Sequence, residues 1–260
     1  MTILEMKKML QTITSPNDDR LKLLRADQRI GVQKLVRQWD KAYERQLKQE
    51  EAYEMIQSFE KEARSKGYTT IAGIDEVGRG PLCGPVTAAC VVLPEVISLQ
   101  GLTDSKKLSE QNRNEYARMI ETQAIAIGKG EATPGEIDQL NIYEASKLAM
   151  MRALEQVRNT CDVDYLLVDA MKLPVDLPQH DLIKGDARSI SIAAASVIAK
   201  VTRDQLMKKL DDFYPEYGLK SHMGYGTKAH LEALDIYGPA EIHRMSFAPV
   251  RERANSHNQK

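Results

Sequence analysis

The residues with the most evident chemical potential lie in one short segment, residues 73–85, which reads Gly-Ile-Asp-Glu-Val-Gly-Arg-Gly-Pro-Leu-Cys-Gly-Pro. Asp75 and Glu76 are adjacent carboxylates at the end of an apolar run, and carboxylate oxygens are the ligands that Mg²⁺ and similar hard cations prefer. Gly78 and Gly80 follow them, and a glycine backbone can approach a sugar or phosphate without hindrance from a Cβ atom. Metal ligands beside accessible backbone donors are what phosphodiester chemistry requires. The segment therefore indicates metal-assisted chemistry on a phosphodiester.

Two more carboxylates, Asp169 and Asp186, stand at or just after the ends of predicted strands. Strand ends and the loops that follow them are where open α/β sheets place their sites. Each acid also has an ordinary structural interpretation, since Asp169 could cap a buried strand and Asp186 could be the N-cap of the next helix. Asp75 and Glu76 alternate in direction on a regular strand, so we expect them to converge only if the strand breaks there. Together, the four acids favour a metal-binding cluster over four separate structural roles.

The elements that must position these acids are short strands and longer helices. Short runs rich in apolar residues predict strands at residues 70–75, 85–93, 124–132, 165–169 and 181–184. One helix is expected over residues 142–159, and another begins near Ile190. Alanines at 193–195 would allow this second helix to pack closely on a sheet. The order of elements predicts an α/β fold with a mixed sheet and helices on both faces.

The region before the first strand has a different sequence pattern. Apolar residues recur along one face of a predicted helix at Val32, Val36, Trp39, Tyr43 and Leu47. Gly67 ends this region. We therefore predict a helical N-terminal extension over residues 1–67 and a catalytic domain over residues 68–260 that includes a C-terminal helical segment. The extension is expected to pack on the core, with a nucleic-acid-binding or partner-binding arm as the alternative.

Charge is distributed unevenly along the chain. Residues 1–70 contain 14 basic and 11 acidic side chains, net +3, whereas the remainder contains 22 basic and 26 acidic side chains, net −4. Because the catalytic part is net acidic, its overall charge would not attract nucleic acid. Bound divalent cations and a local basic patch would have to supply the attraction instead.

Composition also limits the compartment. The chain has 42% apolar and 28% charged residues, the proportions of a soluble globular protein, and no apolar run approaches the length of a membrane span. Its N-terminus lacks the uninterrupted apolar core of a secretory signal. The three cysteines are odd in number and lack metal-ligand spacing. These features predict a cytoplasmic protein with reduced thiols and no membrane partner.

Six segments of the chain are distinctive, namely Gly73-Ile-Asp-Glu-Val-Gly-Arg-Gly-Pro, Asp104-Ser-Lys-Lys-Leu-Ser, Leu167-Val-Asp, Lys184-Gly-Asp-Ala-Arg-Ser, Ile192-Ala-Ala-Ala-Ser-Val-Ile-Ala-Lys and Gly224-Tyr-Gly-Thr. In this order, they resemble the ribonuclease HII family of bacteria. The resemblance spans residues 70 to about 250 and leaves residues 1–67 largely outside it. It implies a ribonuclease H-like fold with a mixed five-stranded sheet. The related ribonuclease HIII typically has a lysine where Arg79 stands, so Arg79 favours ribonuclease HII.

The resemblance also implies the roles of individual residues. The family's four acidic positions, which serve as catalytic residues and metal ligands, correspond to Asp75, Glu76, Asp169 and Asp186. Two Mg²⁺ or Mn²⁺ ions are expected there with substrate, and Asp75 is the best candidate for a bridging ligand. The loop that reads the ribonucleotide 2′-hydroxyl corresponds to Gly78, Arg79 and Gly80, the tyrosine on the next deoxyribose to Tyr225, and the phosphate contact to Lys106.

The activity that this implies is endonucleolytic. The enzyme would hydrolyse the RNA strand of RNA–DNA hybrids and cut 5′ to single ribonucleotides in duplex DNA, leaving 5′-phosphate and 3′-hydroxyl ends. It would act as a monomer in ribonucleotide removal. Two alternatives remain at this stage, a ribonuclease HIII-like hybrid nuclease and a non-catalytic module that binds RNA–DNA hybrids.

Overall fold

A mixed five-stranded sheet forms the centre of the fold in the computed structural model, which describes residues 1–257. The strands are β1 (Ile71–Val77), β2 (Val86–Val92), β3 (Ala126–Ala132), β4 (Tyr165–Asp169) and β5 (Gln179–Leu182). Their order in the sheet is β3-β2-β1-β4-β5. β1 pairs with β2, and β2 with β3, in antiparallel fashion, whereas β1, β4 and β5 run parallel. The predicted α/β class and mixed sheet are confirmed.

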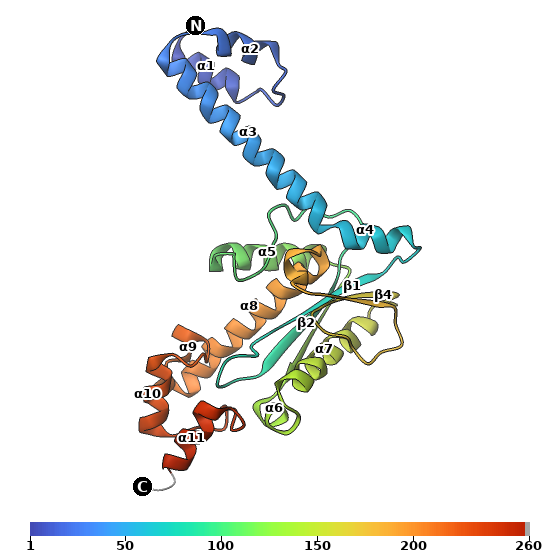
Figure 1. The fold of residues 1–260 in the computed structure, drawn as a ribbon, viewed down its shortest axis with the longest axis vertical. Helices are drawn as coiled ribbons and strands as arrows, with labels where there is room; N and C mark the ends of the chain where they lie inside the picture. The colour runs from blue at the N-terminus through green and yellow to red at the C-terminus, as the bar shows by residue number, and fades with distance from the viewer. Residues whose placement is uncertain (258–260) are drawn as a thin grey trace. The chain divides into compact units, whose positions relative to one another are not determined.

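Helices cover both faces of this sheet (Figure 1). The helices that follow β2 are α5 (Glu110–Gln123), α6 (Pro134–Leu140), α7 (Ile142–Arg158), α8 (Ile190–Phe213), α9 (Leu219–His222), α10 (Lys228–Tyr237) and α11 (Ala248–His257). Because side chains alternate along a strand, Ala72 and Ile74 of β1 join the core cluster that contains the buried face of α7. Ile71 belongs instead to the cluster that contains Ile192 of α8. The core is therefore split between the two faces.

α8 lies unusually close to β1. A Cβ atom on Gly73 would be 2.1 Å from the backbone carbon of Ser191, so no larger residue fits at this strand position. Ala193, Ala194 and Ala195 are fully buried, which confirms that the small residues of α8 permit close packing. Asp75, two residues further along the same face of β1, is consequently hydrogen-bonded to Ser196 of α8.

The N-terminal region is helical, as predicted. Its helices are α1 (Ile3–Leu10), α2 (Asp19–Ala26), α3 (Ile30–Ile56) and α4 (Ser58–Ser65). Val32 and Val36 of α3 are buried with residues of α1 and α2, but Leu47 is 39% exposed because the apolar cluster ends before it. The chain divides into two compact units, Met1–Glu54 and Met55–Lys260.

Two helices were missed from sequence, α5 and α6. Residues 110–123 were expected to be part of a loop between two strands, but they form α5, with Ser109 as N-cap. Only Ala117 and Ile120 of this helix are buried, so its apolar periodicity is weak. Within the described residues, no helix has the length and apolarity that a membrane crossing requires.

Candidate active site

Asp75 and Glu76 lie at the carboxyl end of β1. The predicted strand break at these residues does not occur, because β1 continues to Val77, which still pairs with Thr87 of β2. The two carboxylates nevertheless converge, and Asp75, Glu76 and Asp169 each offer an oxygen within 4.8 Å of the others. The parallel register places Asp75 beside Asp169, because Ile74 pairs with Val168 and the next residues along the two strands are these two acids.

Without a bound cation, the carboxylates of this cluster lie close together with little positive charge to offset theirs. Asp75 is 6% exposed, and burial raises the pKa of its carboxyl well above the usual value, followed by the charges of Glu76 and Asp169. Burial likewise raises the pKa of Glu76 to about 7, although the Arg79 guanidinium lies 3.2 Å away. Glu76 Oε2 is buried with no hydrogen-bond partner among the described residues. An all-oxygen donor set with an orphaned buried oxygen fits a hard divalent cation.

Asp186 stands beside this cluster rather than within it. It lies in a 3₁₀ turn, η1 (Gly185–Ala187), and the N-cap of α8 is Ser189 instead, so the N-cap interpretation of Asp186 was wrong. Burial, followed by the charges of Asp104 and Asp169, raises the pKa of Asp186 to about 6. The turn is fixed to β4, because the Gly185 N–H donates to Asp169 Oδ1 at 2.7 Å.

The glycine loop after β1 is shaped by a fully buried arginine. Arg244 donates from Nη2 to the carbonyl of Gly78 (2.6 Å) and from Nη1 to those of Arg79 (3.0 Å) and Pro81 (2.8 Å). Its Nε donates to the carbonyl of Gly84 at 2.9 Å. Burial lowers the pKa of Arg244 to about 9, so the guanidinium still carries its charge at pH 7. One side chain therefore holds four carbonyls of this loop.

A second buried arginine supports the same loop from α8. Arg203 donates to the carbonyls of Pro85 (3.0 Å), Cys83 (3.2 Å) and Met223 (3.0 Å). Gly78 has a φ of 91°, and a Cβ atom there would lie 2.2 Å from Arg203 Nε. Glycine is thus required at residue 78 both by conformation and by space.

Tyr225 lies next to this loop. A Cβ atom on Gly80 would be 3.6 Å from the Tyr225 ring, and Tyr225 is 43% exposed. The Tyr225 carbonyl is hydrogen-bonded to His230 Nδ1 at 3.0 Å, and His230 Nε2 lies 3.1 Å from His243 Nε2. These buried histidines therefore anchor the backbone that carries an accessible aromatic ring.

Lys106 is exposed in the loop that precedes α5, and its charge partly offsets the rise that burial causes in the pKa values of Asp169 and Asp186. The neighbouring Ser105 is buried, and its hydroxyl lies 2.9 Å from that of Ser196 in α8. The structure thus brings Lys106 close to the acids and ties its loop to α8.

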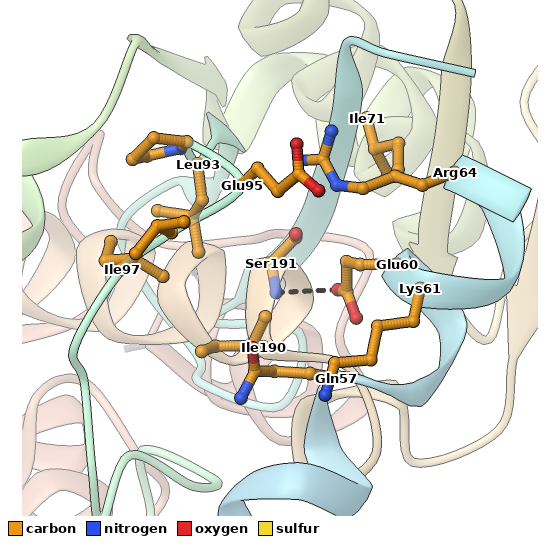
Figure 2. Close-up of a pocket in the computed structure, with 12 residues that line it drawn as sticks. Gln57, Glu60, Lys61, Arg64, Ile71, Leu93, Glu95, Ile97, Ile190 and Ser191 are labelled. Carbon is orange, nitrogen blue, oxygen red and sulfur yellow. Dashed lines mark hydrogen bonds between the residues drawn. The ribbon is translucent and has the colours of Figure 1, made fainter. Parts of the chain in front are cut away.

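Glu60 of α4 supports the turn that carries Asp186. Its Oε1 accepts hydrogen bonds from the Ser189 hydroxyl at 2.5 Å and from the Ser191 N–H at 3.0 Å, and Figure 2 shows the second of these contacts within a pocket of about 240 Å³. Glu60 Oε2 is buried without a hydrogen-bond partner in the part of the chain described. Glu60 therefore connects α4 to the start of α8, three residues after Asp186.

Replacing Glu60 with Ala should raise the divalent-metal concentration for half-maximal activity by about 10-fold, because groups that hold metal ligands in place typically contribute 10- to 100-fold. Metal titration of cleavage tests this. Glu62→Ala is the matched control, since Glu62 is an exposed residue of the same helix paired with Lys66. A lower melting temperature with an unchanged metal requirement would mean that Glu60 is only structural.

Sequence reasoning missed four residues of this site, namely Glu60, Asp104, Arg203 and Arg244. Asp104 had a detectable signal, because it is an acid within a segment that carries the family resemblance. The two arginines had none, because arginine is rarely buried and its partners here are distant backbone carbonyls. Glu60 could not be recognised, because it lies in a helix whose many charged residues are typical of an exposed helix.

The raised carboxyl pKa values predict a pH-dependent stability of the metal-free protein. The pKa of Glu76 rises from its usual 4.5 to about 7. Within the pH range between these two values, the folded state therefore binds more protons than the unfolded state. Stability must then fall as pH rises through it. Burial lowers the pKa values of His230 and His243, which makes an opposite contribution that fades above about pH 6.5, whereas the strongly raised pKa of Asp75 adds to the fall.

We therefore expect the melting temperature of the metal-free protein to fall between about pH 6.5 and pH 8, and saturating Mg²⁺ to remove most of this fall because metal ligands must be deprotonated. Thermal unfolding in chelator and in Mg²⁺ measures both effects. A melting temperature that rises with pH in chelator would contradict the assignment.

Comparison with known proteins places this site in a family. The model for ribonuclease HII matches residues 72–250, and the model for the ribonuclease HII N-terminal domain matches residues 2–64. A ribonuclease HII of Bacillus cereus is 54% identical over 252 residues, covering 97% of this chain and 97% of that protein.

Solved structures agree on the fold. The ribonuclease H2 from Pyrococcus horikoshii OT3 is similar with a TM-score of 0.63 and 25% identity, covering 74% of this chain and 100% of that one. Bst-RNase HIII in complex with Mn²⁺ is similar with a TM-score of 0.61 and 17% identity, covering 74% of this chain and 71% of that one.

These matches correct one expectation. The resemblance seen in the sequence left residues 1–67 outside the family, whereas residues 2–64 match a family model of their own. The ribonuclease H-like fold and the enzyme class are confirmed. Because the ribonuclease HII model covers more than half of the chain and a relative matches it almost from end to end, the chain belongs to the ribonuclease HII family of metal-dependent endonucleases.

Proposed function

We propose that this chain hydrolyses the RNA strand of RNA–DNA hybrids and cuts duplex DNA on the 5′ side of single embedded ribonucleotides. The products would carry 5′-phosphate and 3′-hydroxyl ends, and the biological role would be ribonucleotide removal from DNA. The observation that carries the proposal is the position of the glycine loop. It connects directly to the strand that bears Asp75 and Glu76, and its Gly80 lies against the accessible Tyr225 ring.

The catalytic roles are proposed for the four acids, Asp75, Glu76, Asp169 and Asp186, which would hold two Mg²⁺ or Mn²⁺ ions when substrate is bound. Divalent ions at such carboxylates supply an activated water and stabilise the charge of a leaving oxygen. The chain's own contribution is to hold the acids in fixed positions. The Gly185 N–H holds Asp169 and the Glu76 N–H donates to Asp75 Oδ1 at 2.8 Å.

Substrate recognition is proposed for the loop Gly78, Arg79 and Gly80 and for Tyr225 and Lys106. Backbone groups suit the reading of a 2′-hydroxyl, which alone distinguishes ribose from deoxyribose at a given site, because the arginines hold this backbone in one shape. Tyr225 would pack on the following deoxyribose. Lys106 would contact a phosphate from the loop beside Asp169 and Asp186.

We further propose that residues 68–260 carry the chemistry and that residues 1–67 form an extension to them, in a cytoplasmic monomer. The boundary at residue 67 is supported by the end of α4 at Ser65 and by Gly67, whose φ is 96°. The extension also contributes Glu60 to the support of the Asp186 turn. Gel filtration with light scattering tests the monomer.

The experiment that tests the proposed function compares three labelled duplexes, one of DNA with a single ribonucleotide, one an RNA–DNA hybrid and one entirely of DNA. We expect a metal-dependent cut 5′ to the single ribonucleotide, cleavage within the hybrid, and no cleavage of DNA. Cleavage of the hybrid alone would favour a ribonuclease HIII-like specificity. Binding without cleavage of any duplex would leave only a hybrid-binding module.

A further inference from the structure

A row of basic side chains runs along α3 on the side opposite its apolar face. The row consists of Lys34, Arg37, Lys41, Arg45 and Lys48, all of them exposed. At 100° per residue, these five positions fall within an arc of about 80°, and Val32, Val36 and Trp39 lie on the other side of the helix, where they join the apolar cluster with α1 and α2. The first unit of the chain is thus apolar on one side of α3 and cationic on the other.

This row is not the usual mixture of charges on a solvated helix. Consecutive members are three or four residues apart, so each cation has a like charge as its neighbour, an arrangement that destabilises a helix. Asp40 lies outside the row and is paired with Arg25 at 2.7 Å. Glu44 borders the row, but no ion pair joins it to any of the five cations within residues 1–257.

We propose that this row, which contains none of the proposed catalytic residues, binds the phosphate backbone of duplex nucleic acid. The row extends over about 21 Å, which is the axial length of about six base pairs of duplex. Residues 71–260 are net acidic whereas residues 1–70 are net basic, so the row supplies the electrostatic attraction that the catalytic part lacks. The proposal rests on the proposed function, since it makes the duplex that is cut the ligand of this surface.

The test compares two full-length variants that each lose three lysine charges. Lys34→Gln with Lys41→Gln and Lys48→Gln removes alternate members of the row. The matched control, Lys7→Gln with Lys8→Gln and Lys22→Gln, removes exposed lysines of α1 and α2 in the same unit. Glutamine has nearly the helix propensity of lysine, and circular dichroism verifies that both variants fold.

The measurement is the affinity for a ribonucleotide-free DNA duplex between about 50 and 200 mM salt. The row variant should reduce the slope of log affinity against log salt by about 2 to 3, because each phosphate contact contributes about 0.9. The control variant should reduce it by less than about 1. Equal losses in both variants would mean a diffuse charge effect, and no loss in either would mean that the row binds something else; either result overturns the proposal.

Failure of the proposed function gives a different result. If the wild type binds plain DNA through the row but cuts no ribonucleotide-containing duplex, the cleavage specificity is wrong and the surface assignment stands. If the row variant still cuts 5′ to a ribonucleotide while its salt dependence equals that of the wild type, the proposed function stands and the surface assignment is wrong.

Discussion

Asp75→Asn is expected to abolish metal-dependent cleavage and, at the same time, to make the metal-free protein more stable. Loss of a metal ligand removes several kcal/mol of charge stabilisation, and each 1.4 kcal/mol or so is a factor of ten, so we expect kcat/KM to fall by at least about 1000-fold. Stability should rise because the buried Asp75 carboxylate stands among the like charges of Glu76 and Asp169. The amide keeps an oxygen that can accept the Glu76 N–H.

Cleavage assays and thermal unfolding in chelator measure both effects. A gain of 1 kcal/mol corresponds to about 2–4 °C for a chain of this size. Asp181→Asn is the matched control, because Asp181 is an exposed acid of β5 outside the cluster, and both properties should stay near the wild type. Residual activity near the wild-type value, or a lower melting temperature of the Asp75 variant in chelator, would contradict a metal-binding role for this carboxylate.

The largest loss of stability is expected for Arg244→Ala. The substitution leaves the buried carbonyls of Gly78, Arg79, Pro81 and Gly84 without their donor, and each orphaned group costs about 1–3 kcal/mol. The unfolding free energy should therefore fall by more than about 4 kcal/mol, a large share of the total for a typical protein. Denaturant unfolding of the variant measures this loss.

Because a loss of that size can mask any effect on cleavage, Arg244→Lys separates shape from stability. Lysine keeps the charge but lacks the planar fork, so it cannot reach four carbonyls at once. We expect kcat/KM for a single-ribonucleotide duplex to fall by about 10- to 100-fold, since a displacement of about 1 Å at a site can have an effect of that size. Arg251→Lys is the control, as Arg251 is exposed and, within residues 1–257, its guanidinium bonds only to the Ser246 carbonyl. Wild-type activity in Arg244→Lys would show that the loop does not depend on the arginine fork.

The sheet and its two main helices could be predicted because their signals are local. Strands and helices are marked by periodicity over a few residues, and the observed bounds of the strands differ from the predicted ones by only a residue or two. α5 shows the limit of this approach. It buries only two apolar residues, so its sequence does not differ enough from that of a polar loop.

The four acids were also accessible from sequence, since each lies at or just beyond the end of a strand and such ends meet in an open sheet. Their convergence was predicted for the wrong reason, because β1 does not break at Asp75 and it is the parallel pairing with β4 that places Asp75 beside Asp169. The supports of the glycine loop could not be found in this way. Arg244 reaches carbonyls about 160 residues earlier in the chain, and a contact over that separation leaves no local pattern.

The contacts of α8 have a consequence for how this chain can change in evolution. Ser189 at its N-cap bonds Glu60, Ser196 contacts the Lys106 loop, and Arg203 holds the glycine loop. These three residues are spaced seven apart, two helical turns each time. Adding or deleting one residue between them would rotate everything downstream by about 100° and would separate contacts that point substitutions leave in register. Relatives should therefore differ by substitutions on the exposed face of α8 far more often than by insertions or deletions within it.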